Sequence, residues 1–217
     1  MTRTVIVWRH GRTAWNLAGR VQGLTDVPLD EVGREQAREA AARLASLRPS
    51  RIVTSDLSRA RETADELGRL TGVTVETDAR LRERSFGVRE GLTMSEAWEQ
   101  LPEHMARWAA GDEAGIPGSE SSAAAGERFT SALEDHLQDL GQDETLVVVA
   151  HGGVTRVGIL TFLGFPRDTW ESFGGLSNCA WTVLEEGDLG GTGLRWRVIE
   201  WNAGTLPEPV LSDEEPG

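Results

Sequence analysis

Two of the four histidines in this sequence stand at the ends of apolar runs and directly before glycine, with Arg9 between the first run and its histidine. Residues 4–8, which are rich in β-branched side chains, lead into Arg9-His10-Gly11, and residues 145–150 lead into His151-Gly152-Gly153. The first motif combines a fixed positive charge, a nucleophilic imidazole and a small residue that permits close backbone approach. This combination suits a catalytic site, although Arg-His-Gly alone is a weak motif.

The two apolar runs are typical of buried strands, and the histidines would lie at the carboxyl ends of these strands. In open α/β sheets the loops at the carboxyl ends of the strands form the binding crevice. We therefore expect His10 and His151 to meet there. His104 and His136 lie in polar helical contexts, and we expect them to be ordinary surface or core residues.

Strand and helix patterns alternate along the chain, which is typical of a parallel α/β sheet. Amphipathic turns between Gly91 and Gly118 indicate a helical insertion over one end of that sheet. No repeat or second domain is visible, so residues 1–205 are expected to form one domain, followed by an acidic, disordered tail at residues 206–217. We expect strands at residues 4–8, 51–54, 73–77 and 145–150, helices from Asp30 to before Pro49 and at residues 58–71, 123–140 and 154–163, and a closing hairpin of residues 180–184 and 194–201.

Composition excludes several classes of function. The net charge of −13 opposes extended contact with nucleic acid or anionic lipid, so we expect neither a nucleic acid nor a membrane partner. All 22 basic residues are arginine, which excludes a P-loop lysine and a Schiff-base lysine. The single Cys179 cannot form an internal disulfide, and the N-terminus lacks a long apolar run, so we expect the cytoplasm as the compartment.

Further motifs follow the first histidine in a fixed order through most of the chain. They are Arg9-His10-Gly11-Arg12-Thr13-Ala14-Trp15-Asn16 with Gly19-Arg20-Val21-Gln22-Gly23, then Ser55-Asp56-Leu57-Ser58-Arg59-Ala60, Leu81-Arg82-Glu83, Gly118-Ser119-Glu120-Ser121, and Val149-Ala150-His151-Gly152-Gly153. In these motifs the sequence resembles the histidine phosphatase, or phosphoglycerate mutase-like, superfamily. The resemblance implies a three-layer α/β/α fold with a mostly parallel central sheet and a helical insertion over the active site.

The resemblance also implies a catalytic set. His10 would attack phosphorus and carry the phosphoryl group as phosphohistidine. Arg9 and Arg59 would bind the phosphoryl oxygens, and His151 would complete their pocket as a hydrogen-bond donor. Glu83 would protonate the leaving oxygen and then activate water. An isolated glutamate here would instead be expected to pair with a neighbouring arginine, a reading that the motif context disfavours.

Further positions are expected to bind the phosphate or the rest of the substrate: Asn16, Gln22, Gly23, Arg12 and Gly152. Arg12 departs from the family pattern, in which an acidic or amide residue is common, so its contact with substrate is an open question. Arg61 and Arg128 are expected to be helix-surface or structural residues rather than catalytic groups. Four scattered histidines offer no recognisable metal site, so we expect no metal and no other cofactor.

Three functions remain open. A mutase needs extra basic groups on the insertion, whereas residues 91–118 hold Arg107 against five acidic residues, which favours a phosphatase. A phosphoglycerate mutase is the rival enzyme, and a catalytically silent phospholigand-binding protein is the third alternative. The C-terminal segments 174–182 and 194–203 resemble actinobacterial glucosyl-3-phosphoglycerate phosphatases. That sugar phosphate is therefore the first candidate among small phosphomonoester substrates, ahead of α-ribazole phosphate and broad specificity.

Two further features carry weaker expectations. The eight tryptophans are more often core anchors than sugar-stacking platforms at spacings such as Trp98 to Trp108. A homodimer is the expected oligomer, because dimers are common in the family and are the commonest oligomer in general.

Overall fold

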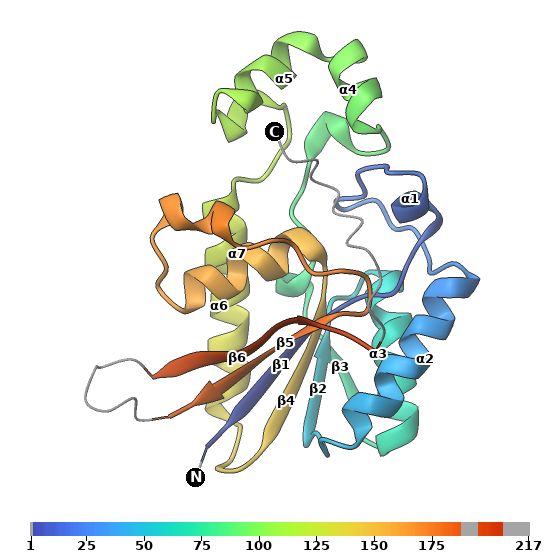
Figure 1. Cartoon of the computed structure of the whole chain (residues 1–217), viewed down its shortest axis with the longest axis vertical. Helices are drawn as coiled ribbons and strands as arrows, with labels where there is room; N and C mark the ends of the chain where they lie inside the picture. Colours follow the sequence, from blue (N-terminus) through green and yellow to red (C-terminus); the bar gives the residue numbers. More distant parts are fainter. Residues whose placement is uncertain (1, 188–194, 206–217) are drawn as a thin grey trace.

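The computed structural model describes residues 2–187 and 195–205 of the chain. Its centre is a six-stranded sheet with the strand order β3-β2-β4-β1-β5-β6 (Figure 1). The strands β1 to β4 run parallel to one another, whereas β5 is antiparallel to β1 and β6 is antiparallel to β5. The predicted mostly parallel sheet is therefore confirmed. The strands are β1 (Thr4–Arg9), β2 (Arg51–Thr54), β3 (Val75–Thr77), β4 (Thr145–Ala150), β5 (Trp181–Glu186) and β6 (Trp196–Ala203).

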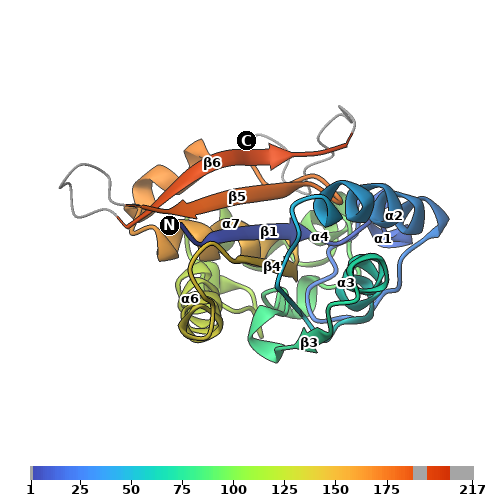
Figure 2. The same cartoon turned by 90° about the horizontal axis from the view of Figure 1, so that it is seen from below.

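Helices cover both faces of the sheet, as the three-layer prediction requires (Figure 2). One face packs on α2 (Glu31–Ala45) and α3 (Ser58–Thr71), and the other on α6 (Ser122–Gln138) and α7 (Gly152–Phe162). Successive side chains of a strand point to opposite faces. Val5 and Val7 of β1 accordingly enter the core under α6 and α7, while Ile6 and Trp8 enter the core under α2 and α3. A strand buried on both faces must be apolar throughout, which explains the uninterrupted run at the start of the chain.

The predicted insertion forms a helical cover beyond the carboxyl ends of the parallel strands (Figure 1). It has a small core of its own, made of Ala97, Met105 and Ile116. We call residues 85–121 the cover. The cover contains α4 (Met94–Gln100), α5 (Pro102–Ala109) and the 3₁₀ turns η2 (Gly87–Arg89) and η3 (Glu113–Gly115). The remaining short elements lie outside the cover and are α1 (Ala14–Leu17) and the 3₁₀ turns η1 (Ala79–Leu81) and η4 (Arg167–Ser172).

Several predicted boundaries were wrong by a few residues. β3 has three residues rather than five, because Gly72 ends α3 in the left-handed region at φ 73° and only three residues pair with β2. α6 begins at Ser122 and ends at Gln138, and the side chain of Ser121 accepts the backbone N–H of Ala124 as its N-cap. Residue 194 of the predicted hairpin and the predicted acidic tail at residues 206–217 lie outside the described residues.

The start of α7 is the correction that bears on function. The sequence predicted a helix from residue 154, but the helix begins at Gly152, with His151 in the N-cap position. Two backbone N–H groups of this first turn, those of Gly153 and Val154, donate to the carboxylate of Glu83. The first turn of a helix leaves such groups without intrahelical partners, so a carboxylate stabilises the helix here. In the described part of the chain, no helix has the length and apolar character to span a membrane.

Candidate active site

The central strand pair places the two histidines side by side. β1 and β4 are in a register that sets Arg9 opposite Ala150, so His10 and His151 each leave the sheet one residue later. The backbone N–H of His10 donates to the carbonyl of Ala150 at 3.0 Å, and the imidazole centroids lie 5.1 Å apart. The two strand ends thus deliver both rings to one point at the carboxyl edge of the sheet.

His10 is buried and neutral. Burial, followed by the positive charges of Arg59 and Arg9, holds the pKa of His10 well below its ordinary value of 6.5. Its Nδ1 lies 2.7 Å from the carbonyl of Gly11, which can only accept, so Nδ1 carries the proton. In a neutral ring Nε2 then has a lone pair. Nε2 of His10 can therefore act as a nucleophile without losing a proton first.

Arg59 is the most deeply buried cation of the site, with no exposed surface. Its Nη1 and Nη2 donate to the carbonyls of Thr25 and Gly23 at 2.9 and 2.8 Å, and its Nε donates to His151 Nδ1 at 3.1 Å. Burial lowers the pKa of Arg59 to about 10, which leaves the guanidinium protonated at neutral pH. Arg59 thereby places a permanent positive charge beside both imidazoles.

The contact with Arg59 also fixes the tautomer of His151. Burial, followed by the charge of Arg59, holds the pKa of His151 well below 6.5, so this ring is neutral as well. Because Nδ1 accepts from Arg59, the single ring proton must be on Nε2, which lies 2.8 Å from Ser55 Oγ. His151 is therefore a hydrogen-bond donor through Nε2.

Arg9 follows the last residue of the apolar run and is almost fully buried. Its Nη1 donates to the carbonyl of Leu176 at 2.5 Å. The guanidinium packs so closely under the start of α7 that a Cβ on Gly152 would lie 3.1 Å from Arg9 Cζ. The glycine in this position therefore leaves the space that the arginine occupies.

Glu83 also lies against the first turn of α7 and is buried. Its Oε2 accepts the N–H of Gly153 at 2.8 Å, and its Oε1 accepts the N–H groups of Val154 and Arg84 at 2.7 and 2.8 Å. The alternative in which Glu83 pairs with the side chain of Arg82 or Arg84 is wrong, since Arg82 forms an ion pair with Asp56 and Arg84 forms one with Glu113. Glu83 instead binds the first turn of α7, the helix whose N-cap residue is His151.

Two predicted polar residues lie in the loop after His10. Asn16 Oδ1 accepts from the N–H of Thr13 at 3.1 Å and from Asn178 Nδ2 at 3.3 Å, whereas its buried Nδ2 has no partner among the described residues. Gln22 is buried, and its Oε1 accepts from Thr13 Oγ1 at 3.0 Å. Asn178 also contacts the backbone carbonyl of His10 at 3.2 Å. Asn16 therefore holds an unused amide donor close to the nucleophile.

Gly23 and Arg12 occupy structural positions in the same loops. Gly23 has φ 56°, a left-handed conformation, and a Cβ there would overlap the Glu90 carboxylate. That carboxylate accepts the N–H groups of the two following residues and so fixes the loop whose carbonyls hold Arg59. Arg12 Nε donates to Asp30 Oδ2 at 2.8 Å, an ion pair at the N-cap of α2.

Ser55 and Asn178 belong to the site, although no role was predicted for either of them from the sequence. Ser55 follows β2 directly, so the rule that places residues at the carboxyl ends of strands could have found it. Asn178 precedes the antiparallel strand β5, to which that rule does not apply. His104 and His136 lie elsewhere, as expected, since they contact the carbonyl of Gly115 and the carboxylate of Asp78.

Two acidic residues of the cover form ion pairs with arginines from other parts of the chain. Glu96 forms an ion pair with Arg20, and Glu113 forms ion pairs with Arg84 and Arg167, all three of which come from outside that segment. These arginines offset part of the negative charge that residues 91–118 carry. Among the described residues, no group of three or more histidine, cysteine, aspartate or glutamate side chains could hold a metal ion.

Comparisons with known proteins agree with this geometry. The family model described as "Histidine phosphatase superfamily (branch 1)" matches residues 5–202. A glucosyl-3-phosphoglycerate phosphatase of Mycolicibacterium vanbaalenii is 36% identical over 213 residues, which cover 93% of this chain and 95% of that protein. The structure of a mycobacterial glucosyl-3-phosphoglycerate phosphatase in complex with VO3 superposes with a TM-score of 0.82 at 36% identity, covering 93% of this chain and 100% of that one. A probable phosphoglycerate mutase of Yersinia enterocolitica is 36% identical over 163 residues, 75% of each chain.

Proposed function

Since the chain belongs to the histidine phosphatase superfamily, in which it is a phosphatase, we propose that it hydrolyses glucosyl-3-phosphoglycerate through a phosphohistidine on His10. One observation carries the chemical part of the proposal: a buried, neutral imidazole with an unprotonated Nε2 lies between two arginines and a second neutral imidazole. The proposed substrate is supported by the similarity to two glucosyl-3-phosphoglycerate phosphatases, each of which matches 93% of the chain.

In the first half-reaction His10 Nε2 forms a bond to phosphorus as the bond between phosphorus and the ester oxygen breaks. A dissociative transition state spreads negative charge over the phosphoryl oxygens, so catalysis depends mainly on positioning and on positive charge. Arg9 and Arg59 supply that charge in fixed positions, without a change of protonation state. His151 Nε2–H would turn from Ser55 to a phosphoryl oxygen.

The loop after the nucleophile would supply further donors. The unpartnered Nδ2 of Asn16 is an amide donor that adds no charge, and we assign it to a phosphoryl oxygen. Gln22 and the backbone at Gly23 and Gly152 complete the proposed pocket. We assign Arg12 to the loop rather than to the substrate, because its ion pair with Asp30 uses its Nε.

Glu83 is the proposed proton donor and acceptor. In the first half-reaction its proton would go to the leaving alkoxide oxygen, which leaves Glu83 as a carboxylate. In the second, a water oxygen forms a bond to phosphorus, the bond between phosphorus and His10 Nε2 breaks, and Glu83 takes the proton of that water. Each turnover thus returns Glu83 and His10 to their starting states.

The decisive experiment compares phosphate release from glucosyl-3-phosphoglycerate, 3-phosphoglycerate and p-nitrophenyl phosphate in chelator, for the wild type and His10→Ala. His104→Gln is the matched control, since it removes a partly buried histidine outside the site. We expect selective release from the glucosyl ester that His10→Ala abolishes and His104→Gln retains. Turnover of the glucosyl ester no faster than of the generic ester would refute the substrate assignment.

The same samples separate the two rival functions. Formation of 2-phosphoglycerate from 3-phosphoglycerate, without faster phosphate release, would identify a mutase. Failure to trap an acid-labile phosphoenzyme with any of the three esters would leave a phospholigand-binding protein. Intact His10, Arg9, Arg59, Glu83 and His151 argue against the phospholigand-binding alternative.

We also propose that the enzyme works as a homodimer in the cytoplasm, on small phosphomonoesters and not on nucleic acid. The net charge of −13 and the single cysteine support the compartment and the choice of ligand. β6 lies at one end of the strand order, and an edge strand offers backbone groups to which a second copy can pair. Light scattering coupled to size exclusion tests the dimer, which a monomeric mass at micromolar concentration would exclude.

A further inference from the structure

Arg128, a residue of α6 outside the site, lies against the backbone that leads into Glu83. Its Nη1 donates to the carbonyls of Arg80 and Arg82 at 2.5 and 3.0 Å. Its Nε and Nη2 form a two-pronged ion pair with Glu120 at 3.0 and 2.7 Å. We infer that Arg128 is a positioning residue that fixes the backbone of the proton donor Glu83. This inference rests on the role proposed for Glu83.

The carbonyls that Arg128 binds lie at the end of the turn η1, where the turn itself supplies no hydrogen-bond donor. η1 ends at Leu81, and Arg82 leaves it with ψ 154°, so the chain turns from a 3₁₀ turn to an extended segment directly before Glu83. Carbonyls at the end of a helical turn have no partner within it. The carbonyl of Arg82 belongs to the peptide bond that joins Arg82 to Glu83. A hydrogen bond to this oxygen therefore restricts the orientation of the peptide plane that precedes Glu83, and with it the direction in which the Glu83 side chain leaves the backbone.

The other end of Glu83 is held by the neighbouring helix. The N–H groups of Gly153 and Val154 in α7 bind its carboxylate. α6 and α7 pack closely, since a Cβ on Gly158 of α7 would overlap the ring of Phe129 of α6. Glu83 is thus fixed at its backbone by one helix and at its carboxylate by the other. A small shift of a catalytic group is costly in rate, because proton transfer requires hydrogen-bond contact with the leaving oxygen.

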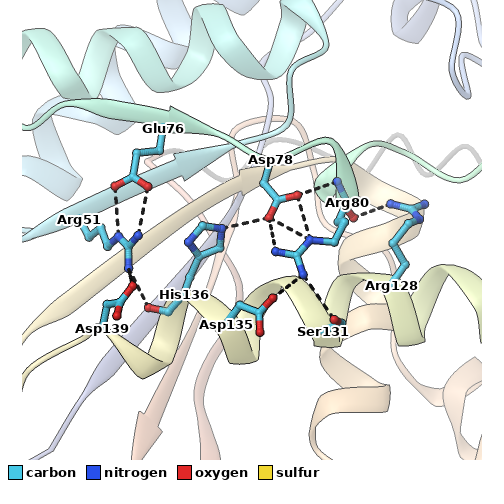
Figure 3. A network of polar contacts seen from close by, with 9 residues as sticks. All are labelled: Arg51, Glu76, Asp78, Arg80, Arg128, Ser131, Asp135, His136 and Asp139. Atoms are coloured by element: carbon cyan, nitrogen blue, oxygen red, sulfur yellow. Dashed lines mark hydrogen bonds and ion pairs between the residues drawn. The ribbon is translucent and has the colours of Figure 1, made fainter.

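A second set of contacts between η1 and α6 gives a matched control. Figure 3 shows the side chain of Arg80 between Asp78 and Asp135, and Arg128 reaching the backbone oxygen of Arg80. The Arg80–Asp135 pair lies at the surface, with 37% and 56% of the two side chains exposed. Exposed pairs contribute little, and this one does not touch the peptide that joins Arg82 to Glu83. Asp135→Asn therefore removes a link between the same two elements without freeing that peptide.

The experiment measures kcat/KM for two esters that differ in their need for a proton. The alkoxide that leaves 3-phosphoglycerate needs protonation, whereas p-nitrophenolate leaves without it. We expect Arg128→Gln to lower kcat/KM at least about tenfold more for 3-phosphoglycerate than for p-nitrophenyl phosphate, in the same sense as Glu83→Gln but to a smaller extent. Arg128→Lys, which keeps the charge and one donor group, should give an intermediate ratio.

Two controls match this change. Arg61→Gln removes the same charge from an exposed position on α3, and Asp135→Asn removes the surface link. Both should leave the ratio of the two kcat/KM values at the wild-type level. Equal losses on both esters in Arg128→Gln, while Glu83→Gln is selective, would overturn the inference. A shifted ratio in Asp135→Asn would also overturn it, because linkage of η1 to α6 in general would then suffice.

A different outcome would point to the proposed function rather than to Arg128. If Glu83→Gln itself lowers both kcat/KM values equally, Glu83 is not the proton donor, and the role assigned to it fails first. Should Arg128→Gln not fold, Arg128→Lys supplies the ratio, and an unchanged ratio in that folded variant counts against the positioning role.

Discussion

The fold should lose stability when the pH falls from about 7 to about 5.5, because His10 and His151 are held neutral. Burial and the nearby guanidinium of Arg59 keep the pKa of both rings well below 6.5, whereas the unfolded chain restores the ordinary value. Protons therefore bind the unfolded state better. The contribution of these two histidines to the free energy of unfolding is present in full above about pH 6.5, and it decreases as the pH falls through that value.

The size of the effect follows from the unfolded imidazole. At about one pH unit below its pKa of about 6.5, protonation stabilises the unfolded chain by about 1.4 kcal/mol per histidine, against about 0.2 kcal/mol at pH 7. Two rings that stay neutral in the folded state give a loss of about 2.5 kcal/mol. The carboxylates with lowered pKa, such as Glu186 with a pKa of about 2, act mainly at lower pH, because the unfolded carboxyl titrates near 4.5.

Urea denaturation at the two pH values, in buffer without phosphate, measures this difference. Phosphate must be absent, because a ligand of the folded state would mask the change. His10→Gln and His151→Gln should each remove about half of the loss, and the double variant nearly all of it. Glutamine can still donate to the Gly11 carbonyl or accept from Arg59 without titrating. A loss of about 2.5 kcal/mol that persists in the double variant would refute the claim that these two rings are neutral in the folded protein.

Three further substitutions test the geometry of the site. Gly153→Ala would place a methyl group 2.8 Å from Glu83 Oε1, so kcat/KM for alkyl phosphomonoesters should fall at least about tenfold. The circular dichroism spectrum should stay unchanged, and unchanged turnover would contradict the placement of Glu83. Gly23→Ala puts a side chain at φ 56° and against the carboxylate of Glu90, so urea denaturation should show a loss of about 2 kcal/mol or more. Arg59→Lys keeps the charge but loses the planar set of donors, so kcat/KM should fall about 100-fold, and wild-type activity would show that charge alone suffices.

The fold was predictable where burial on both faces leaves a signal in the sequence. β1 and β4 are uninterrupted apolar runs because both faces of the sheet are covered by helices, and their type and place were correct. β3 was predicted too long, since it is an edge strand of three residues without such a signal. The start of α7 was missed because its first turn depends on Glu83, which lies about seventy residues earlier in the chain.

Residues of the site were likewise predictable where the sequence near them determines their place, and not where a distant segment does. The rule for strand ends predicted that His10 and His151 would meet, since β1 and β4 are neighbours in the sheet. Asn178 could not be predicted, because it reaches the backbone of His10 only through the antiparallel placement of β5. The partners of the acidic residues in the cover could not be predicted for a related reason: the fold brings in Arg20 and Arg167 from distant parts of the chain.

The separate small core of the cover has a consequence for exchange of backbone amide protons. The strands that carry His10 and His151 are central in the sheet, whereas Ala97, Met105 and Ile116 form a cluster that the two main cores do not share. Elements with few buried contacts open at lower free energy than central strands. Amides of α4 and α5 should therefore exchange with deuterium by local opening, and those of β1 and β4 only through global unfolding. The cover would then open on a faster timescale than the strands that carry the nucleophile.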